Sequence, residues 1–172
     1  MVDRSDAFMS SSIYKREEAI GVFILNCGVA EMATFLWITG LSTDIMLREV
    51  AIDMPFSKRI ALVCKLIKRS NQPDAEKSRS LAMWGEVARI ADTTRNKIAH
   101  SPLCQNPNGS DEWGFIDVKK MKGAGPYQIE PLQFDDILKE GSKLAKILPE
   151  LLKAFAADFK RGSGSNDIHE TC

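Results

Sequence analysis

Residues Ala19–Leu41 form the longest apolar stretch of this 172-residue chain, and Glu31 is their single charged side chain. A helix of this length could cross the hydrocarbon core of a membrane. Asn26 and Glu31 argue against a span, because polar side chains are costly in hydrocarbon, about 2–3 kcal/mol for the carboxylate alone. No second span is visible. We therefore predict a helix buried almost all round, either central in a helical bundle or shared with a second subunit.

The apolar residues of the rest of the chain recur mostly at helical spacing. Asp44 provides an N-cap for the next helix, and Pro55 marks the start of another. Pro102 disfavours helical geometry at the residue before it, so a later helix should end at or near His100. Amphipathic helices are predicted at 44–53, 56–69, 74–100 and 134–159.

Two of these helices have faces of distinct character. The core-facing stripe of the helix at 74–100 should consist of Leu81, Trp84, Val87, Ala91 and Ile98. The helix at 56–69 has a basic face with Lys58, Arg59, Lys65, Lys68 and Arg69. Such a face could follow a nucleic-acid backbone, but more often it is simply solvent-exposed, and we interpret it so.

A short β-hairpin is predicted before the last helix. Residues 113–120 and 127–132 have strand-like alternation on either side of a glycine-rich turn, and 103–111 has the Asn, Pro and Gly content of a loop. The predicted fold is therefore mainly α: an up-and-down helical bundle of about four long helices with a small β-hairpin. We expect a single domain at 13–160, a flexible leader at 1–12 and a disordered Gly/Ser-rich tail at 161–172.

The composition narrows the classes of function. With 23 Lys and Arg against 23 Asp and Glu, the chain lacks the broad basic field of a non-specific nucleic-acid binder. Its four cysteines, Cys27, Cys64, Cys104 and Cys172, are scattered, which indicates reduced thiols in a cytoplasmic protein. Neither a metal site nor a cofactor is expected, and we expect no association with a membrane.

The stretch 95–100, Arg-Asn-Lys-Ile-Ala-His, carries the candidate chemistry. Asn96 and His100 are four residues apart, so on a helix the amide could orient the imidazole. Arg95 points to a different sector, but its long side chain could reach the same phosphate-sized ligand. Arginine holds phosphate oxygens by paired hydrogen bonds, and histidine exchanges protons near neutral pH. The alternative is that these are ordinary basic residues at a helix C-terminus, where the macrodipole favours them.

Two carboxylates are weaker, supporting candidates. Asp92 lies three residues before Arg95 and could orient either it or Asn96, or could form an ordinary ion pair within the helix. A buried Glu31 would need a cationic partner, which Arg95 could provide. Alternatively, Glu31 is an exposed charge on the thin polar side of its helix.

The order of these features resembles the HEPN superfamily. The Arg-Asn-x-x-x-His stretch at 95–100 is similar to the Arg-x-x-x-x-His signature of that family, in its common Arg-Asn form, and the likeness in architecture covers about 16–160. The resemblance implies a helical bundle, often dimeric, in which Arg95 and His100 are the catalytic pair and Asn96 supports them. Some members are regulated by modification of a tyrosine two residues after the histidine. Here that position is Pro102, so the same regulation is not expected.

The resemblance implies a metal-independent ribonuclease of a toxin–antitoxin or other defence system, with RNA as substrate and an antitoxin or other protein as partner. Cleavage of RNA by its own 2′-hydroxyl needs a base, an acid and positive charge. Two copies of the chain in a homodimer would supply two histidines and two arginines without a metal. Two alternatives stay open: a non-catalytic HEPN-like module that binds a protein or nucleic acid, and a plain helical scaffold.

Overall fold

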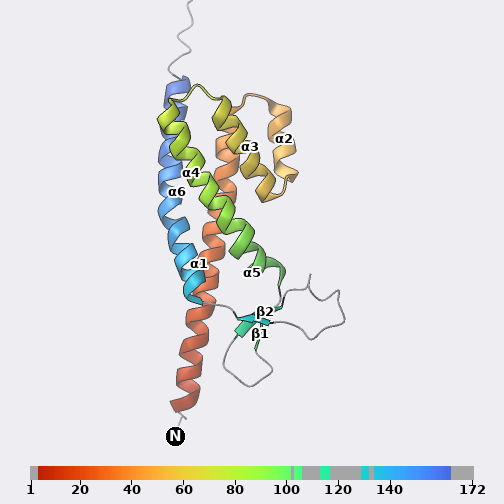
Figure 1. Cartoon of the computed structure of the whole chain (residues 1–172), viewed down its shortest axis with the longest axis vertical. Helices are drawn as coiled ribbons and strands as arrows, with labels where there is room; N and C mark the ends of the chain where they lie inside the picture. The colour runs from red at the N-terminus through yellow and green to blue at the C-terminus, as the bar shows by residue number, and fades with distance from the viewer. Residues whose placement is uncertain (1–3, 102, 106–112, 117–128, 132–133, 164–172) are drawn as a thin grey trace, which may run out of the picture. The chain divides into compact units, whose positions relative to one another are not determined.

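The computed structural model describes residues 4–101, 103–105, 113–116, 129–131 and 134–163. This part of the chain is mainly helical, with the character of a helical bundle, as predicted (Figure 1). The elements are α1 (Arg4–Leu41), α2 (Ile45–Asp53), α3 (Phe56–Arg69), α4 (Asp74–Ile90), a π-helical turn η1 (Ala91–Arg95), α5 (Asn96–His100), β1 (Leu103–Gln105), β2 (Trp113–Ile116), β3 (Ile129–Pro131) and α6 (Phe134–Ser163).

The chain divides into two compact units, each built from two separate segments of the sequence, where the sequence predicts one domain at 13–160. Unit 1 comprises Met1–Cys27 and Arg89–Lys143, and unit 2 comprises Gly28–Ala88 and Leu144–Cys172. Helix α1 begins at Arg4, inside the segment expected to be a flexible leader, and α6 ends at Ser163, inside the expected tail. Helix growth from an existing turn is favourable, whereas starting one is costly, so long helices readily extend into polar flanks.

The core of unit 2 is centred on two tryptophans. Trp37 on α1 and Trp84 on α4 are fully buried and meet edge to face, with ring centroids 6.2 Å apart. The ring of Phe155 on α6 packs on the other side of Trp37, at 6.1 Å. Gly40 lies so close to Phe155 that a side chain at position 40 would overlap with the ring. Aromatic burial of this kind supplies a large apolar area and fixed ring geometry.

Arg59 on α3 is a buried cation in unit 2, which corrects its assignment to a solvent-exposed face. Its guanidinium donates to Glu31 Oε2 at 3.2 Å and to the carbonyl oxygen of Met54 at 3.0 Å. The rings of Phe35 and Phe56 lie 4.5 Å and 6.0 Å from the guanidinium carbon. A planar, weakly hydrated guanidinium tolerates such burial when a carboxylate and aromatic faces surround it.

In unit 1, α1 and α6 are in close contact. Gly141 lies against the buried ring of Phe23, and its carbonyl accepts a hydrogen bond from Asn26 Nδ2 at 3.3 Å. The guanidinium of Arg16 lies 4.9 Å from the centre of the Phe134 ring. Asn26, which argued against a membrane span, therefore has a partner within the protein.

The described residues between α5 and α6 form three short strands. They form an antiparallel sheet in the order β1-β2-β3, with Cys104 opposite Gly114, and Phe115 opposite Glu130. β1 lies in the segment expected to be a loop, at 103–111. The hairpin was expected at 113–120 and 127–132, and residues 117–128, including its turn, lie outside the described residues.

Helix α1 is not buried all round by this chain. Residues 15–41 are long and apolar enough to cross a membrane, and about one third of an 18-residue window there is buried. The buried face includes Ala19, Phe23, Cys27, Ala30, Ala33, Thr34, Trp37 and Ile38. The exposed side carries the large apolar residues Val22, Ile24, Leu25, Met32 and Leu36.

Candidate functional site

The motif at 95–100 lies at the end of one helical run in unit 1. α4 passes into the π turn η1, where the N–H of Asn96 bonds to the carbonyl of Ala91, and α5 continues to His100. Ser101 leaves the helix with φ −121° and ψ 126°, and its N–H bonds to the carbonyl oxygen of Lys97 at 3.0 Å. The predicted end of the helix at His100 is confirmed, and the proline after Ser101 explains its extended backbone.

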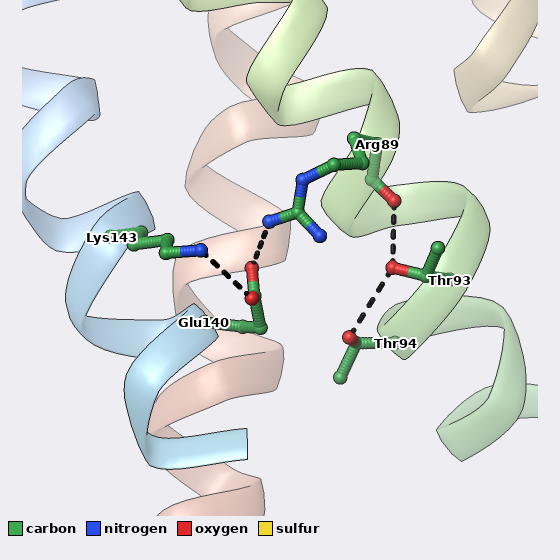
Figure 2. A network of polar contacts seen from close by, with 5 residues as sticks. All are labelled: Arg89, Thr93, Thr94, Glu140 and Lys143. Carbon is green, nitrogen blue, oxygen red and sulfur yellow. Dashed lines mark hydrogen bonds and ion pairs between the residues drawn. The ribbon is translucent and has the colours of Figure 1, made fainter. Parts of the chain in front are cut away.

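The π turn that leads into the motif, and that ends with its first residue, Arg95, has no counterpart among the elements predicted from the sequence. Thr93 Oγ1 donates to the carbonyl of Arg89 at 2.8 Å and lies 3.5 Å from Thr94 Oγ1 (Figure 2). Hydroxyl groups that bond back to the carbonyl four residues earlier perturb regular helices, and π turns are frequent at functional sites. The turn takes one residue more than an α turn, so it rotates the motif relative to the residues just before it.

The three catalytic candidates do not converge within one chain. Arg95 is half-buried and donates to Asn96 Oδ1 at 3.4 Å, while Asn96 and His100 are exposed. The amide oxygen of Asn96 is therefore engaged by Arg95 and not by the imidazole. The imidazole of His100 forms no hydrogen bond or ion pair with any residue in the part of the chain that the structure describes.

The two supporting candidates have different surroundings. Asp92 is exposed in the π turn and has no ion pair with another described residue. The wider turn changes the spacing on which ion pairs three or four residues apart depend. Glu31 belongs to unit 2, where its carboxylate binds Arg59.

A polar cluster next to the motif was not predicted from the sequence. Arg89, the residue just before Ile90 at the end of α4, forms an ion pair with Glu140 on α6, and Lys143 Nζ donates to the same carboxylate at 3.0 Å (Figure 2). The Glu140 side chain is only 12% exposed, whereas those of Arg89 and Lys143 are 42% and 39% exposed. The spacing of Glu140 and Lys143 predicts their ion pair, but nothing in the sequence links either to Arg89, 51 residues before Glu140.

The end of the helical run in unit 1 has more cationic than acidic side chains. The run 89–100 carries Arg89, Arg95, Lys97 and His100 against one acidic residue, Asp92. Among the described residues, no group of three or more His, Cys, Asp or Glu side chains could hold a metal ion. Arginine and lysine side chains can donate hydrogen bonds to anionic oxygens, and an imidazole can exchange protons near neutral pH.

Comparisons of the chain with protein-family models, with curated proteins and with solved structures found no match.

Proposed function

We propose that this protein is a HEPN-type, metal-independent endoribonuclease whose active site forms between two copies of the chain. The observation that carries the proposal is the exposed imidazole of His100 on the last turn of a helix that also bears Arg89, Arg95 and Lys97. A cytoplasmic protein of a toxin–antitoxin or other defence system, held inactive by a protein partner, fits this activity.

The reaction would use the 2′-hydroxyl of the RNA as its nucleophile. A base takes the proton of that hydroxyl, its oxygen attacks the adjacent phosphorus, and an acid protonates the departing 5′-oxygen, leaving a 2′,3′-cyclic phosphate. Arg95 would stabilise the negative charge that builds up on the phosphate oxygens. His100 would be the acid or the base.

A second copy of the chain would supply the missing group. Arg95 and His100 are five residues apart, which places them about 140° apart around a regular helix. One chain has a single described histidine, His100, whereas acid and base together call for two. Two motifs that face each other would provide two imidazoles and two guanidinium groups in one cleft.

The exposed side of α1 supports the homodimer. Val22, Leu25, Val29, Met32 and Leu36 are spaced alternately three and four residues apart, and all except the half-buried Val29 are exposed. Apolar residues with this spacing form the seam of paired helices. A second copy of the chain packed on this side of α1 would remove the apolar surface from water. The helix would then be shared between the two subunits.

The proposal is tested by incubating the purified protein with fluorescently labelled single-stranded and hairpin RNAs, with and without EDTA. We expect cleavage in both conditions and product ends that carry a 2′,3′-cyclic phosphate. His100→Ala should abolish cleavage, while the matched control His169→Ala, which changes the only other histidine, should not. Activity that disappears with EDTA, or that persists in His100→Ala, would rule the mechanism out.

A non-catalytic binding module is the second candidate, and α2 favours it. This nine-residue helix exposes four large apolar side chains, Ile45, Met46, Val50 and Ile52, while Ala51 is its buried residue. Such a surface is typical of a helix that binds another protein. Inactivity on a broad RNA panel, together with stable binding of a partner that Met46→Glu abolishes, would favour this module over the enzyme.

A further inference from the structure

Helix α3 in unit 2 has one cationic side. Its 14 residues include five cations and no acidic residue. Four of these cations are exposed: Lys58, Lys65, Lys68 and Arg69. Lys65 and Arg69 follow Lys58 by seven and eleven residues, about two and three turns of a helix, so these three lie in one row. Lys68 lies beside the row, and we call the four residues the α3 cationic face. The opposite, buried side consists of Arg59, Ile60, Val63 and Ile67.

No carboxylate of a described residue neutralises the α3 cationic face. None of its four cations forms an ion pair with another residue in the part of the chain that the structure describes. The fifth cation of the helix, Arg59, binds Glu31. In α4 and α6, by contrast, acidic residues lie three positions from lysines and form ion pairs with them. The face is therefore a local concentration of positive charge on a chain whose formal net charge is zero.

The stability of the helix does not account for the whole face. Lys68 and Arg69 are in the last turn of α3, where the helix macrodipole favours cations. Lys58 is in the first turn, where the macrodipole disfavours a positive charge, and no acidic residue accompanies it there. A helix face that serves only to keep a protein soluble usually carries charges of both signs. These features favour a face that binds an anionic partner.

The α3 cationic face lacks the apolar residues that a protein partner would need. None of the large apolar residues that are exposed in the described chain belongs to α3, and the other exposed residues of the helix, Ser57 and Ala61, are small. Protein interfaces have an apolar core and place charges mainly at the rim. A nucleic-acid backbone, in contrast, is bound by lysine and arginine without apolar contacts. From Lys58 to Arg69 the row extends about 16 Å along the helix, long enough to meet several successive phosphates.

We propose that the α3 cationic face binds the phosphate backbone of the RNA substrate, independently of the RNA sequence. The inference rests on the proposed function for the identity of the ligand, and it adds a substrate-binding surface in unit 2. The four cations would displace counterions from successive phosphates of the strand. Bases are not read here, because the exposed residues of α3 include no aromatic side chain on which a base could stack.

Helix α6 provides a matched control pair. Lys139 and Lys146 are also exposed lysines seven residues apart on one helix, and neither forms an ion pair with another described residue. They differ from Lys58 and Lys65 in having acidic residues close by in the sequence, since Glu140 follows Lys139 directly. Replacing either pair by glutamine removes two positive charges. Glutamine and lysine have similar helix propensities, so both double variants should fold.

The test measures RNA binding by the cleavage-deficient His100→Ala protein. Fluorescence anisotropy would be recorded over a series of salt concentrations with two labelled single-stranded RNAs, an oligouridylate and an RNA of mixed sequence. Adding Lys58→Gln and Lys65→Gln together should weaken the binding of both RNAs by on the order of tenfold at low salt. The dependence of log K on log salt should also flatten by about 1.4, which is about 0.7 for each phosphate no longer neutralised. Lys139→Gln and Lys146→Gln together should change neither quantity.

A charge-preserving variant separates the loss of charge from any disturbance of the fold. Lys58→Arg and Lys65→Arg together should retain the binding. Equal losses in the two double glutamine variants, or no loss in either, would overturn the proposed surface. Displacement of the RNA by polyglutamate, as effective as displacement by unlabelled RNA at equal charge concentration, would also overturn it. An acidic protein segment would then fit the face as well as RNA does.

The outcomes for this surface and for the enzyme can be told apart. A protein that never cleaves RNA, but whose RNA binding depends on Lys58 and Lys65, would support the surface and contradict the proposed function. Cleavage by the Lys58→Gln and Lys65→Gln double variant with an unchanged KM and salt dependence would support the enzyme and contradict the surface. If both proposals hold, this double variant should have a raised KM and a nearly unchanged kcat.

Discussion

Arg59 and Glu31 form an ion pair between α3 and α1, with a guanidinium nitrogen 3.2 Å from the carboxylate oxygen. The Arg59 side chain is 9% exposed and the Glu31 side chain 31% exposed, so the pair is largely withdrawn from water. Removing one partner of such a pair leaves the other charge buried without compensation. The resulting loss of stability is larger than the net contribution of the intact pair. This ion pair gives Glu31 a structural role in unit 2.

Glu31→Gln should therefore lower stability and leave RNA cleavage intact. We expect a loss of about 1–3 kcal/mol in the free energy of unfolding, because a neutral amide replaces the carboxylate that compensates Arg59. Urea denaturation followed by tryptophan fluorescence measures it, and a cleavage assay well below the transition gives the activity. A stable Glu31→Gln variant that no longer cleaves RNA would place Glu31 in the active site instead.

Arg95→Ala should slow RNA cleavage by a factor that corresponds to about 2–4 kcal/mol of barrier, as the loss of an oxyanion-stabilising donor does. Asn96→Ala should cost less, since Asn96 contacts Arg95 and acts only by orienting it. Single-turnover rates separate chemistry from product release. If Asn96→Ala were slower than Arg95→Ala, the amide itself would have to contact the reacting phosphate.

The wild-type protein should be a homodimer at micromolar concentration, and Leu25→Glu should shift it to a monomer. Leu25 is 70% exposed on α1, so a carboxylate there is tolerated by the single chain but not at an apolar interface. Size-exclusion chromatography with light scattering gives the mass. Leu138→Glu changes an exposed leucine on α6 and serves as the control. A monomeric wild-type protein would contradict both the interface and the shared active site.

Gly40→Ala should destabilise unit 2 by about 1–3 kcal/mol, because the added methyl group overlaps with the Phe155 ring that packs on Trp37. Gly85→Ala is the matched substitution on α4, where a Cβ would meet nothing within 4 Å. It should stabilise the helix by about 0.5–1 kcal/mol. Urea midpoints of both variants measure the two effects, and a Gly40→Ala protein as stable as wild type would show that Phe155 can move aside.

Cys64 should react slowly with alkylating reagents. Burial raises the pKa of the Cys64 thiol, and the charge of Lys68 offsets only part of this effect. At a given pH, the folded protein therefore contains less of the reactive thiolate than the unfolded chain does. Mass spectrometry of the Cys64 peptide after timed iodoacetamide treatment gives the rate of alkylation. In the folded protein this rate should begin to rise at a higher pH than it does in the protein unfolded in urea. Lys68→Gln should slow the reaction further, and equal rates in folded and unfolded protein would contradict the effect.

The helices could be predicted from the sequence because their signals are local. Asp44 caps α2 by accepting a hydrogen bond from the N–H of Leu47 at 3.3 Å, and the proline after Ser101 ends α5 as expected. Trp84 and Val87 are in the core, whereas Leu81 and Ile98 are only half-buried. The apolar period predicted which side of α4 faces inward, but not how far the neighbouring helices cover it.

The features that could not be predicted depend on contacts between distant residues. The sequence pattern predicts a solvated face for Arg59, since a basic residue among lysines usually lies there, and its burial depends on Glu31, 28 residues earlier. The ion pair of Arg89 and Glu140 likewise joins residues that are distant in the sequence, 51 positions apart. Within the candidate site, the order and helix position of Arg95, Asn96 and His100 followed from the sequence. The π turn that orients them was not predicted, because no sequence pattern distinguished it from a regular α-helix.

The π turn makes the orientation of the motif more sensitive to deletions than to substitutions in the residues before it. Each residue added to a regular helix rotates everything beyond it by about 100°. Arg89 is fixed to α6 by Glu140, and His100 is followed at once by the end of the helix. The direction in which His100 points is therefore set by the number of residues between these two positions more than by their identity. A substitution within 91–94 can be neutral where the deletion of one residue turns the imidazole of His100 in a different direction.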